Sequence, residues 1–164
     1  MNMYVILVKK GCENSVFSEL RKRGFDAVLP LKQEFRKYGE KWRIYEKIIF
    51  VNYVFLRCDL SEKIYYEVQK IDGVICFLGN GNPQNIDFLK PYEQRYIEWL
   101  WNGGKPIESS KIYITPSGDK LVLSGILRKY SGSEIEYNLP KRKAVVCVEI
   151  DGFSHKVELP VTVI

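Results

Sequence analysis

Hydrophobic positions in the first hundred residues switch between the spacing of strands and the spacing of helices. The apolar run at 3–8 predicts a first strand. After it, Val16, Phe17 and Leu20 recur at helical spacing, which predicts a helix over 12–23. Gly24 is expected to end that helix, because glycine accepts the left-handed backbone conformation common after a last helical turn.

The segments that follow alternate in the same way up to residue 101. Ser61 is expected to cap a helix, since it precedes an acidic residue and a helical apolar pattern. The predicted elements are a strand at 25–31, a charged hairpin or loop at 33–47, a strand at 48–56, the helix after Ser61, a strand at 74–78, a turn at 79–83 and a helix at 86–101. This order indicates an α+β sandwich with a mainly antiparallel sheet.

The chain changes character after a segment rich in breakers at 102–110, which we interpret as a linker. Beyond it the helical period is lost, and short β-rich runs are separated by glycines. These runs lie at 111–115, 120–123, 126–129, 144–150 and 155–159. They predict a small all-β barrel. We therefore expect two domains, at 1–101 and 111–164.

Composition narrows the class of protein. The chain has 25 Lys and Arg against 20 Asp and Glu, and this excess weakly favours polyanionic partners. No apolar run is long enough to span a bilayer, so we expect a cytoplasmic monomer with no membrane contact. The four cysteines form no close pair and His155 is the one histidine, so neither a metal, a cofactor nor a disulfide is expected. No phosphate-loop or nucleophile-elbow motif occurs, which argues against an enzyme and leaves no catalytic residue to assign.

Four short segments in the N-terminal part and one long segment in the C-terminal part carry a resemblance to a known family. The former are MYVIL at 3–7, GCEN at 11–14, FVNYVF at 50–55 and GVICFLG at 73–79. They resemble the NGN domain of the NusG family of transcription elongation factors. Residues 118–160 resemble a KOW motif within an SH3-like barrel. The small size of the chain and Asn52, where the family usually has glycine, resemble specialised paralogs. The Ser124-Gly125 pair and the KRKA run at 141–144 resemble LoaP-like antiterminators more than RfaH.

The resemblance implies a function and a set of partners. The NGN domain of this family binds the clamp helices of the RNA polymerase β′ subunit and reaches the β subunit, so that pausing falls. The KOW domain recruits RNA, a ribosomal protein or a termination factor. The implied function is that of a processive antiterminator. Two alternatives stay open: an RNA-binding or ribosome-associated KOW protein without a polymerase role, and a housekeeping elongation factor that recruits a termination factor.

The resemblance also implies a polymerase-binding surface. Tyr53, Phe55 and Phe77 match the aromatic positions that face the clamp in the family's motifs. Phe50 is a weaker member, because alternation along a continuous strand places it opposite Tyr53. The alternative is that these rings form an ordinary hydrophobic core.

Basic residues suggest two nucleic-acid surfaces. Four near the N-terminus match positions that approach the non-template DNA strand in specialised paralogs, and the alternative is a solvated surface. These are Lys9, Lys10, Lys22 and Arg23. Five in the barrel could contact an RNA leader element, although Glu134 and Glu136 dilute their charge. These are Arg128, Lys129, Lys141, Arg142 and Lys143. A protein partner is the alternative for the barrel.

Overall fold

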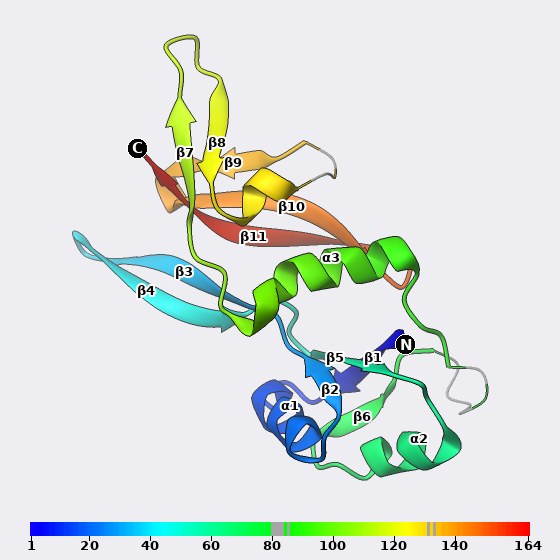
Figure 1. Ribbon diagram of the computed structural model, residues 1–164. Helices are drawn as coiled ribbons and strands as arrows, with labels where there is room; N and C mark the ends of the chain where they lie inside the picture. The colour runs from blue at the N-terminus through cyan, green and yellow to red at the C-terminus, as the bar shows by residue number, and fades with distance from the viewer. Residues whose placement is uncertain (80–83, 85, 131, 133) are drawn as a thin grey trace. The chain divides into compact units, whose positions relative to one another are not determined.

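The computed structural model describes residues 1–79, 84, 86–130, 132 and 134–164 (Figure 1). Most of the turn predicted at 79–83 lies outside the described residues. The chain forms two compact units, one of residues 1–30 and 50–97 and the other of residues 31–49 and 98–164. In the described residues, no helix combines the length and the apolar composition needed to cross a membrane.

The first unit is built on a four-stranded antiparallel sheet in the order β2-β5-β1-β6. Its strands are β1 (Asn2–Val8), β2 (Asp26–Val28), β5 (Tyr53–Cys58) and β6 (Val74–Phe77). Its two helices are α1 (Glu13–Lys22) and α2 (Glu62–Gln69). The Ser61 side chain accepts a hydrogen bond of 3.2 Å from the backbone N–H of Ile64, so the predicted cap of α2 is confirmed.

The second unit contains a long hairpin and a five-stranded sheet. The hairpin pairs β3 (Leu31–Tyr38) with β4 (Lys41–Ile48) without a register shift. The sheet has the order β8-β7-β11-β10-β9, antiparallel except between β7 and β11. Its strands are β7 (Ser110–Ile114), β8 (Lys120–Ser124), β9 (Glu136–Asn138), β10 (Lys143–Ile150) and β11 (Phe153–Val163). The Lys120 ammonium lies 5.6 Å from the centre of the Tyr137 ring, so the two edge strands approach one another.

A third helix, α3 (Pro91–Trp101), begins in the first unit and ends in the second. It starts five residues later than the sequence predicts, at Pro91, because proline fits the first helical position and fits poorly further inside. The predicted mixed α/β class with mainly antiparallel sheets is confirmed. The predicted domain limits stay a prediction, and the compact units differ from them by placing the hairpin with the C-terminal sheet.

Three local expectations were wrong. The strand predicted at 48–56 is interrupted, because β4 ends at Ile48 and the chain turns before β5. The run at 126–129 forms a short 3-10 helix, following Gly125 at a φ of 98°. The sequence pattern also missed β9, which has only three residues.

Candidate functional site

The aromatic residues of β5 lie on one face of the first sheet. In the strand register, Phe55 is opposite Val5 and Tyr53 is opposite Leu7, so the two rings share that face. Their centroids are 6.4 Å apart in an edge-to-face arrangement. Phe55 is fully buried, whereas Tyr53 is partly exposed. The pair therefore offers one accessible ring supported by one buried ring.

Phe50 joins this pair, contrary to the prediction that it lies opposite Tyr53. Its ring centroid is 5.7 Å from that of Phe55, and its side chain is buried. Strand alternation does not apply to it, because Phe50 precedes the turn that leads into β5. Residue Asn52 in that turn has a φ of 74°. The turn thus gathers three aromatic rings, which we call the Tyr53 cluster: Phe50, Tyr53 and Phe55.

Glu13 holds this turn in place. Its buried carboxylate accepts hydrogen bonds of 2.8 Å from the backbone N–H groups of Gly11 and Asn52. The Asn52 side chain in turn donates to the backbone oxygen of Val8 at 3.1 Å. Burial opposes ionisation of Glu13, but the N–H donors outweigh it and lower the pKa of this carboxyl below its ordinary value. No local sequence pattern indicates this role of Glu13, because the role depends on a contact with a residue 39 positions away.

Phe77 lies on the opposite face of the same sheet. It is paired with Ile6 of β1, whose side chain alternates with those of Val5 and Leu7. The Phe77 ring stacks on Tyr65 of α2 with centroids 5.3 Å apart, and it is buried. The structure therefore does not bring Phe77 together with the Tyr53 cluster.

The four basic residues assigned to DNA are exposed on the first unit, at Lys9, Lys10, Lys22 and Arg23. Arg23 differs from the others, because its guanidinium pairs with Glu19 at 2.9 Å and with Glu67 at 3.8 Å. The three lysines form no ion pair with another described residue within the usual distance.

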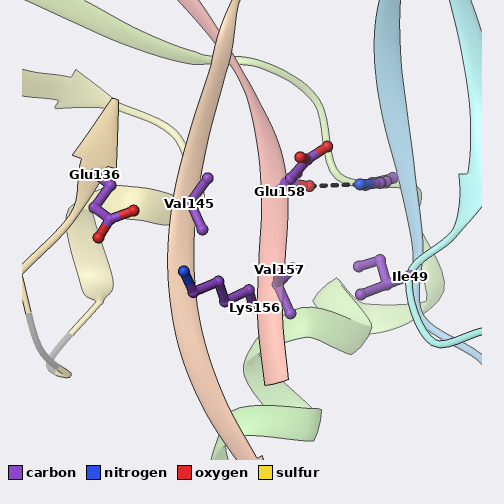
Figure 2. Close-up of a pocket in the computed structure, with 7 residues that line it drawn as sticks. Ile49, Glu136, Val145, Lys156, Val157 and Glu158 are labelled. Carbon is purple, nitrogen blue, oxygen red and sulfur yellow. Dashed lines mark hydrogen bonds between the residues drawn. The ribbon is translucent and has the colours of Figure 1, made fainter. Parts of the chain in front are cut away.

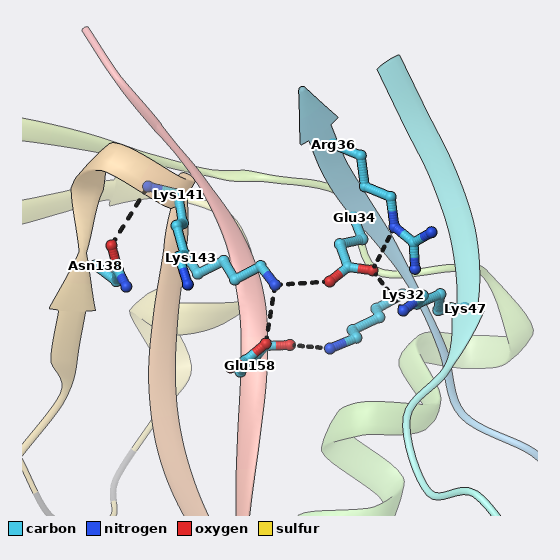
Figure 3. A network of polar contacts seen from close by, with 8 residues as sticks. All are labelled: Lys32, Glu34, Arg36, Lys47, Asn138, Lys141, Lys143 and Glu158. Atoms are coloured by element: carbon cyan, nitrogen blue, oxygen red, sulfur yellow. Dashed lines mark hydrogen bonds and ion pairs between the residues drawn. The ribbon is translucent and has the colours of Figure 1, made fainter. Parts of the chain in front are cut away.

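The five cations assigned to RNA have different surroundings in the second unit. Lys129 and Lys141 are exposed, and Arg128 donates to the backbone oxygen of Leu123 at 3.2 Å. Lys143 lies between two carboxylates, at 2.7 Å from Glu34 and 3.0 Å from Glu158 (Figure 3). Its side chain is therefore engaged within the protein.

Arg142 is engaged by aromatic rings of the hairpin. Its guanidinium lies 4.1 Å from the Trp42 centroid and 5.6 Å from the Phe35 centroid. Such stacking uses the planar face of arginine. The predicted basic surface of the barrel thus divides into two exposed lysines, one arginine bound to a backbone oxygen and two cations that contact the hairpin.

Glu34 organises the charged contacts of the hairpin. This buried carboxylate contacts Lys143 at 2.7 Å and Lys47 at 2.9 Å, with Arg36 at 3.5 Å (Figure 3). Burial opposes its ionisation, but the hydrogen bonds from Lys143 and Lys47 prevail and lower its pKa to about 2. The local sequence signal for this role is that Glu34 is the one glutamate of β3, whose other charged residues are all basic.

A shallow hollow of about 440 Å³ lies beside these contacts (Figure 2). Two lysines and two glutamates, with three aliphatic residues, line it: Lys32, Ile49, Glu136, Val145, Lys156, Val157 and Glu158. Lys32 donates to the backbone oxygen of Glu158 at 2.6 Å, and burial lowers its pKa. Balanced charge of this kind favours neither an anionic nor a cationic ligand. In the described residues, no group of three potential metal ligands is close enough to hold an ion.

Comparison with known proteins places the chain in a family. Residues 1–90 match the family model described as transcription termination factor nusG. The transcription termination/antitermination protein NusG of Helicobacter pylori strain J99 is 24% identical over 155 residues, which are 93% of this chain and 86% of that protein. A solved structure described as domain interaction in Thermotoga maritima NusG has a TM-score of 0.58 at 23% identity, covering 98% of this chain and 93% of that one. This last similarity concerns the fold alone. Because the family model covers more than half of the sequence, the chain belongs to the NusG family of transcription termination factors.

Proposed function

We propose that this protein is a LoaP-like processive antiterminator. It binds elongating RNA polymerase through the first unit, reduces pausing and carries transcription past terminators. It acts in the cytoplasm as a non-catalytic monomer without a cofactor. The observation that supports the proposal best is the Tyr53 cluster, in which a partly exposed ring contacts the buried Phe55 ring, which in turn contacts the buried Phe50 ring.

The Tyr53 cluster suits a helical partner. The tips of the β′ clamp helices would cover the accessible side of Tyr53, with the β subunit as a second contact. Burying apolar surface contributes about 25 cal/mol per Å², and a few aromatic anchors supply most of the energy of such interfaces. Phe55, which is itself packed against Phe50, would hold the Tyr53 ring in one orientation, so little side-chain entropy is lost on binding. Phe77 would contribute indirectly, because its packing against Tyr65 of α2 on the other face stabilises the sheet that carries the Tyr53 cluster.

A nucleic-acid signal would direct the protein to its targets. In the second unit, the exposed Lys129 and Lys141 are suited to phosphates of an RNA leader element. In the first unit, the exposed Lys9, Lys10 and Lys22 are suited to the non-template DNA strand. A ribosomal protein on the barrel is the other partner that the family resemblance implies.

Transcription past a terminator by purified polymerase tests this function. Adding the protein to complexes formed on templates with candidate leader sequences should raise the read-through fraction. Tyr53→Ala should remove the effect, and Tyr66→Ala should retain it. Lower read-through that requires an added termination factor, without dependence on a leader, would favour the housekeeping alternative. No effect on polymerase, together with binding to RNA, would favour the general RNA-binding alternative.

A further inference from the structure

The two faces of the hairpin differ strongly in charge. Because β3 and β4 pair in register, each directly opposed pair of residues lies on one face. One face has five cations and one carboxylate, a formal excess of four positive charges: Lys32, Glu34, Arg36, Lys41, Arg43 and Lys47. The other face has one cation and one carboxylate, Lys37 and Glu46. Charge on the hairpin is therefore segregated to a single side.

Two arginines and two tyrosines alternate on the positive face. Arg36 is directly opposite Arg43, and the Tyr38 and Tyr45 rings are 6.1 Å apart. The Arg36 guanidinium lies 5.4 Å from the Tyr45 centroid, and that of Arg43 lies 5.7 Å from the Tyr38 centroid. Both arginines are exposed, as is 53% of Tyr38. We call this set the arginine–tyrosine ladder.

Acidic side chains neutralise the ladder only in part. Like charges placed directly across a hairpin are destabilising unless another group compensates them. Glu34 is the one carboxylate on this face, and it lies 3.5 Å from Arg36 but is shared with the closer Lys143 and Lys47. In the part of the chain that the structure describes, no carboxylate lies within ion-pair distance of Arg43. The ladder is therefore suited to an external anion.

The aromatic rings of the other face have a different role. Phe35 and Trp42 lie there and receive the Arg142 guanidinium from the barrel. The rings on that face thus hold a cation of the protein itself. The tyrosines of the ladder contact one another and the two arginines of their own face, and they keep exposed surface for planar groups.

We propose that the arginine–tyrosine ladder binds a single-stranded segment of RNA. Successive nucleotides present a phosphate and a flat base in turn, and the ladder presents a guanidinium and a flat ring in turn. Unpaired bases stack on tyrosine, and guanidinium groups bind phosphate. An acidic peptide would match the charge of the ladder and leave its rings unused. This inference concerns the hairpin, whereas the proposed RNA contact of the barrel concerns Lys129 and Lys141, and it does not require polymerase.

Binding of a labelled RNA to the full-length protein tests the proposal. The probe is a fluorescein-labelled oligoadenylate of about a dozen nucleotides, a length that one small binding surface can cover. Fluorescence anisotropy is measured at several salt concentrations. Arg36→Gln combined with Arg43→Gln should weaken binding about tenfold and lower the salt slope by about 1.4, which is roughly 0.7 for each charge lost on a single strand.

Replacement of the rings separates stacking from charge. Tyr38→Leu combined with Tyr45→Leu should weaken binding about tenfold with an unchanged salt slope, because stacking on an aromatic ring is lost. Tyr38→Phe combined with Tyr45→Phe should restore binding, which shows that the leucine variant acts through stacking. Lys37→Gln is the matched control, since it removes a neighbouring cation from the other face and should leave the affinity within about twofold.

Three outcomes would overturn the proposal. The first is an unchanged affinity and salt slope in the double arginine variant, with binding lost in Lys129→Gln and Lys141→Gln. The second is tighter binding of an RNA duplex of the same length. The third is an equal loss in Lys37→Gln. The affinity of the hairpin variants for the β′ clamp helices separates this result from the proposed function, because the ladder lies outside the Tyr53 cluster and its loss should leave that affinity unchanged.

Discussion

The backbone N–H of Asn52 donates a hydrogen bond of 2.8 Å to the buried carboxylate of Glu13. This contact joins the start of α1 to the turn that leads into β5. Asn52 adopts a φ of 74° there, a conformation that glycine accepts without strain and asparagine tolerates better than most residues. The orientation of the Tyr53 cluster therefore depends on a carboxylate outside it.

Replacing Glu13 should destabilise the protein. Glu13→Gln leaves the N–H of Gly11 or of Asn52 without a charged acceptor, at a cost of about 1–3 kcal/mol in the free energy of unfolding. Urea unfolding measures the change. Glu19→Gln is the control, because the Glu19 carboxylate makes a surface ion pair with Arg23, for which the expected change is below about 1 kcal/mol. Equal destabilisation by both substitutions would contradict the role of Glu13.

Two substitutions at Asn52, the residue at positive φ in the turn, should differ in their effect on stability. Asn52→Gly keeps the backbone conformation and loses the side-chain hydrogen bond to Val8, a cost of about 1 kcal/mol. Asn52→Val adds the strain of a β-branched residue at positive φ, for a further cost of about 1–3 kcal/mol. Thermal unfolding should give a higher unfolding temperature for Asn52→Gly than for Asn52→Val. The reverse order would contradict the positive φ at this position.

Glu34 should make the stability of the protein sensitive to acid. Its folded-state pKa of about 2 lies below the ordinary value of 4.5, so its stabilising contribution is complete above 4.5 and is lost as the pH falls towards 2. Glu34→Gln should lower stability at neutral pH and flatten its dependence on pH across this window. Denaturant unfolding at a series of pH values tests this. The same dependence of the unfolding free energy on pH in both proteins would contradict this role of Glu34.

Arg142 should stabilise the contact between hairpin and barrel through its stacking on Trp42. Arg142→Ala removes a guanidinium 4.1 Å from the ring and should cost about 0.5–2 kcal/mol. Near-ultraviolet circular dichroism, which reports on the surroundings of tryptophan, should change with it. Lys141→Ala, at the exposed neighbouring position, is the control and should leave both the spectrum and the stability as they are. Identical spectra for Arg142→Ala and the unsubstituted protein would contradict the stacking.

Local sequence signals predicted most of the elements. The cap at Ser61 and the helix stop at Gly24 depend on neighbours within a few residues, and the corresponding helix start and helix end are present in the structure. The predicted ends of helices and strands were less accurate where a single residue with positive φ determines where an element ends. Asn52 and Gly125 each place a positive φ inside a run that otherwise has the composition of a strand.

The candidate sites were harder to predict, because they depend on contacts between distant residues. Strand alternation placed Phe50 away from Tyr53, but the turn returns it to the Phe55 ring. Lys143 was assigned to RNA on charge alone, and its carboxylate partner Glu34 lies 109 residues away. No local pattern contains such a pairing, so composition identified the cations and not their partners.

Affinity for the β′ clamp helices tests the central claim most directly. A fragment of β′ containing these helices is titrated with the full-length protein and with Tyr53→Ala, Tyr53→Phe and Tyr66→Ala. Tyr66 is 49% exposed on α2, which packs on the opposite face of the sheet, so it is a matched control. The account predicts at least about a tenfold loss of affinity for Tyr53→Ala, as expected for an aromatic anchor, and near-normal affinity for the other two variants. Unchanged affinity in a folded Tyr53→Ala variant would contradict the account.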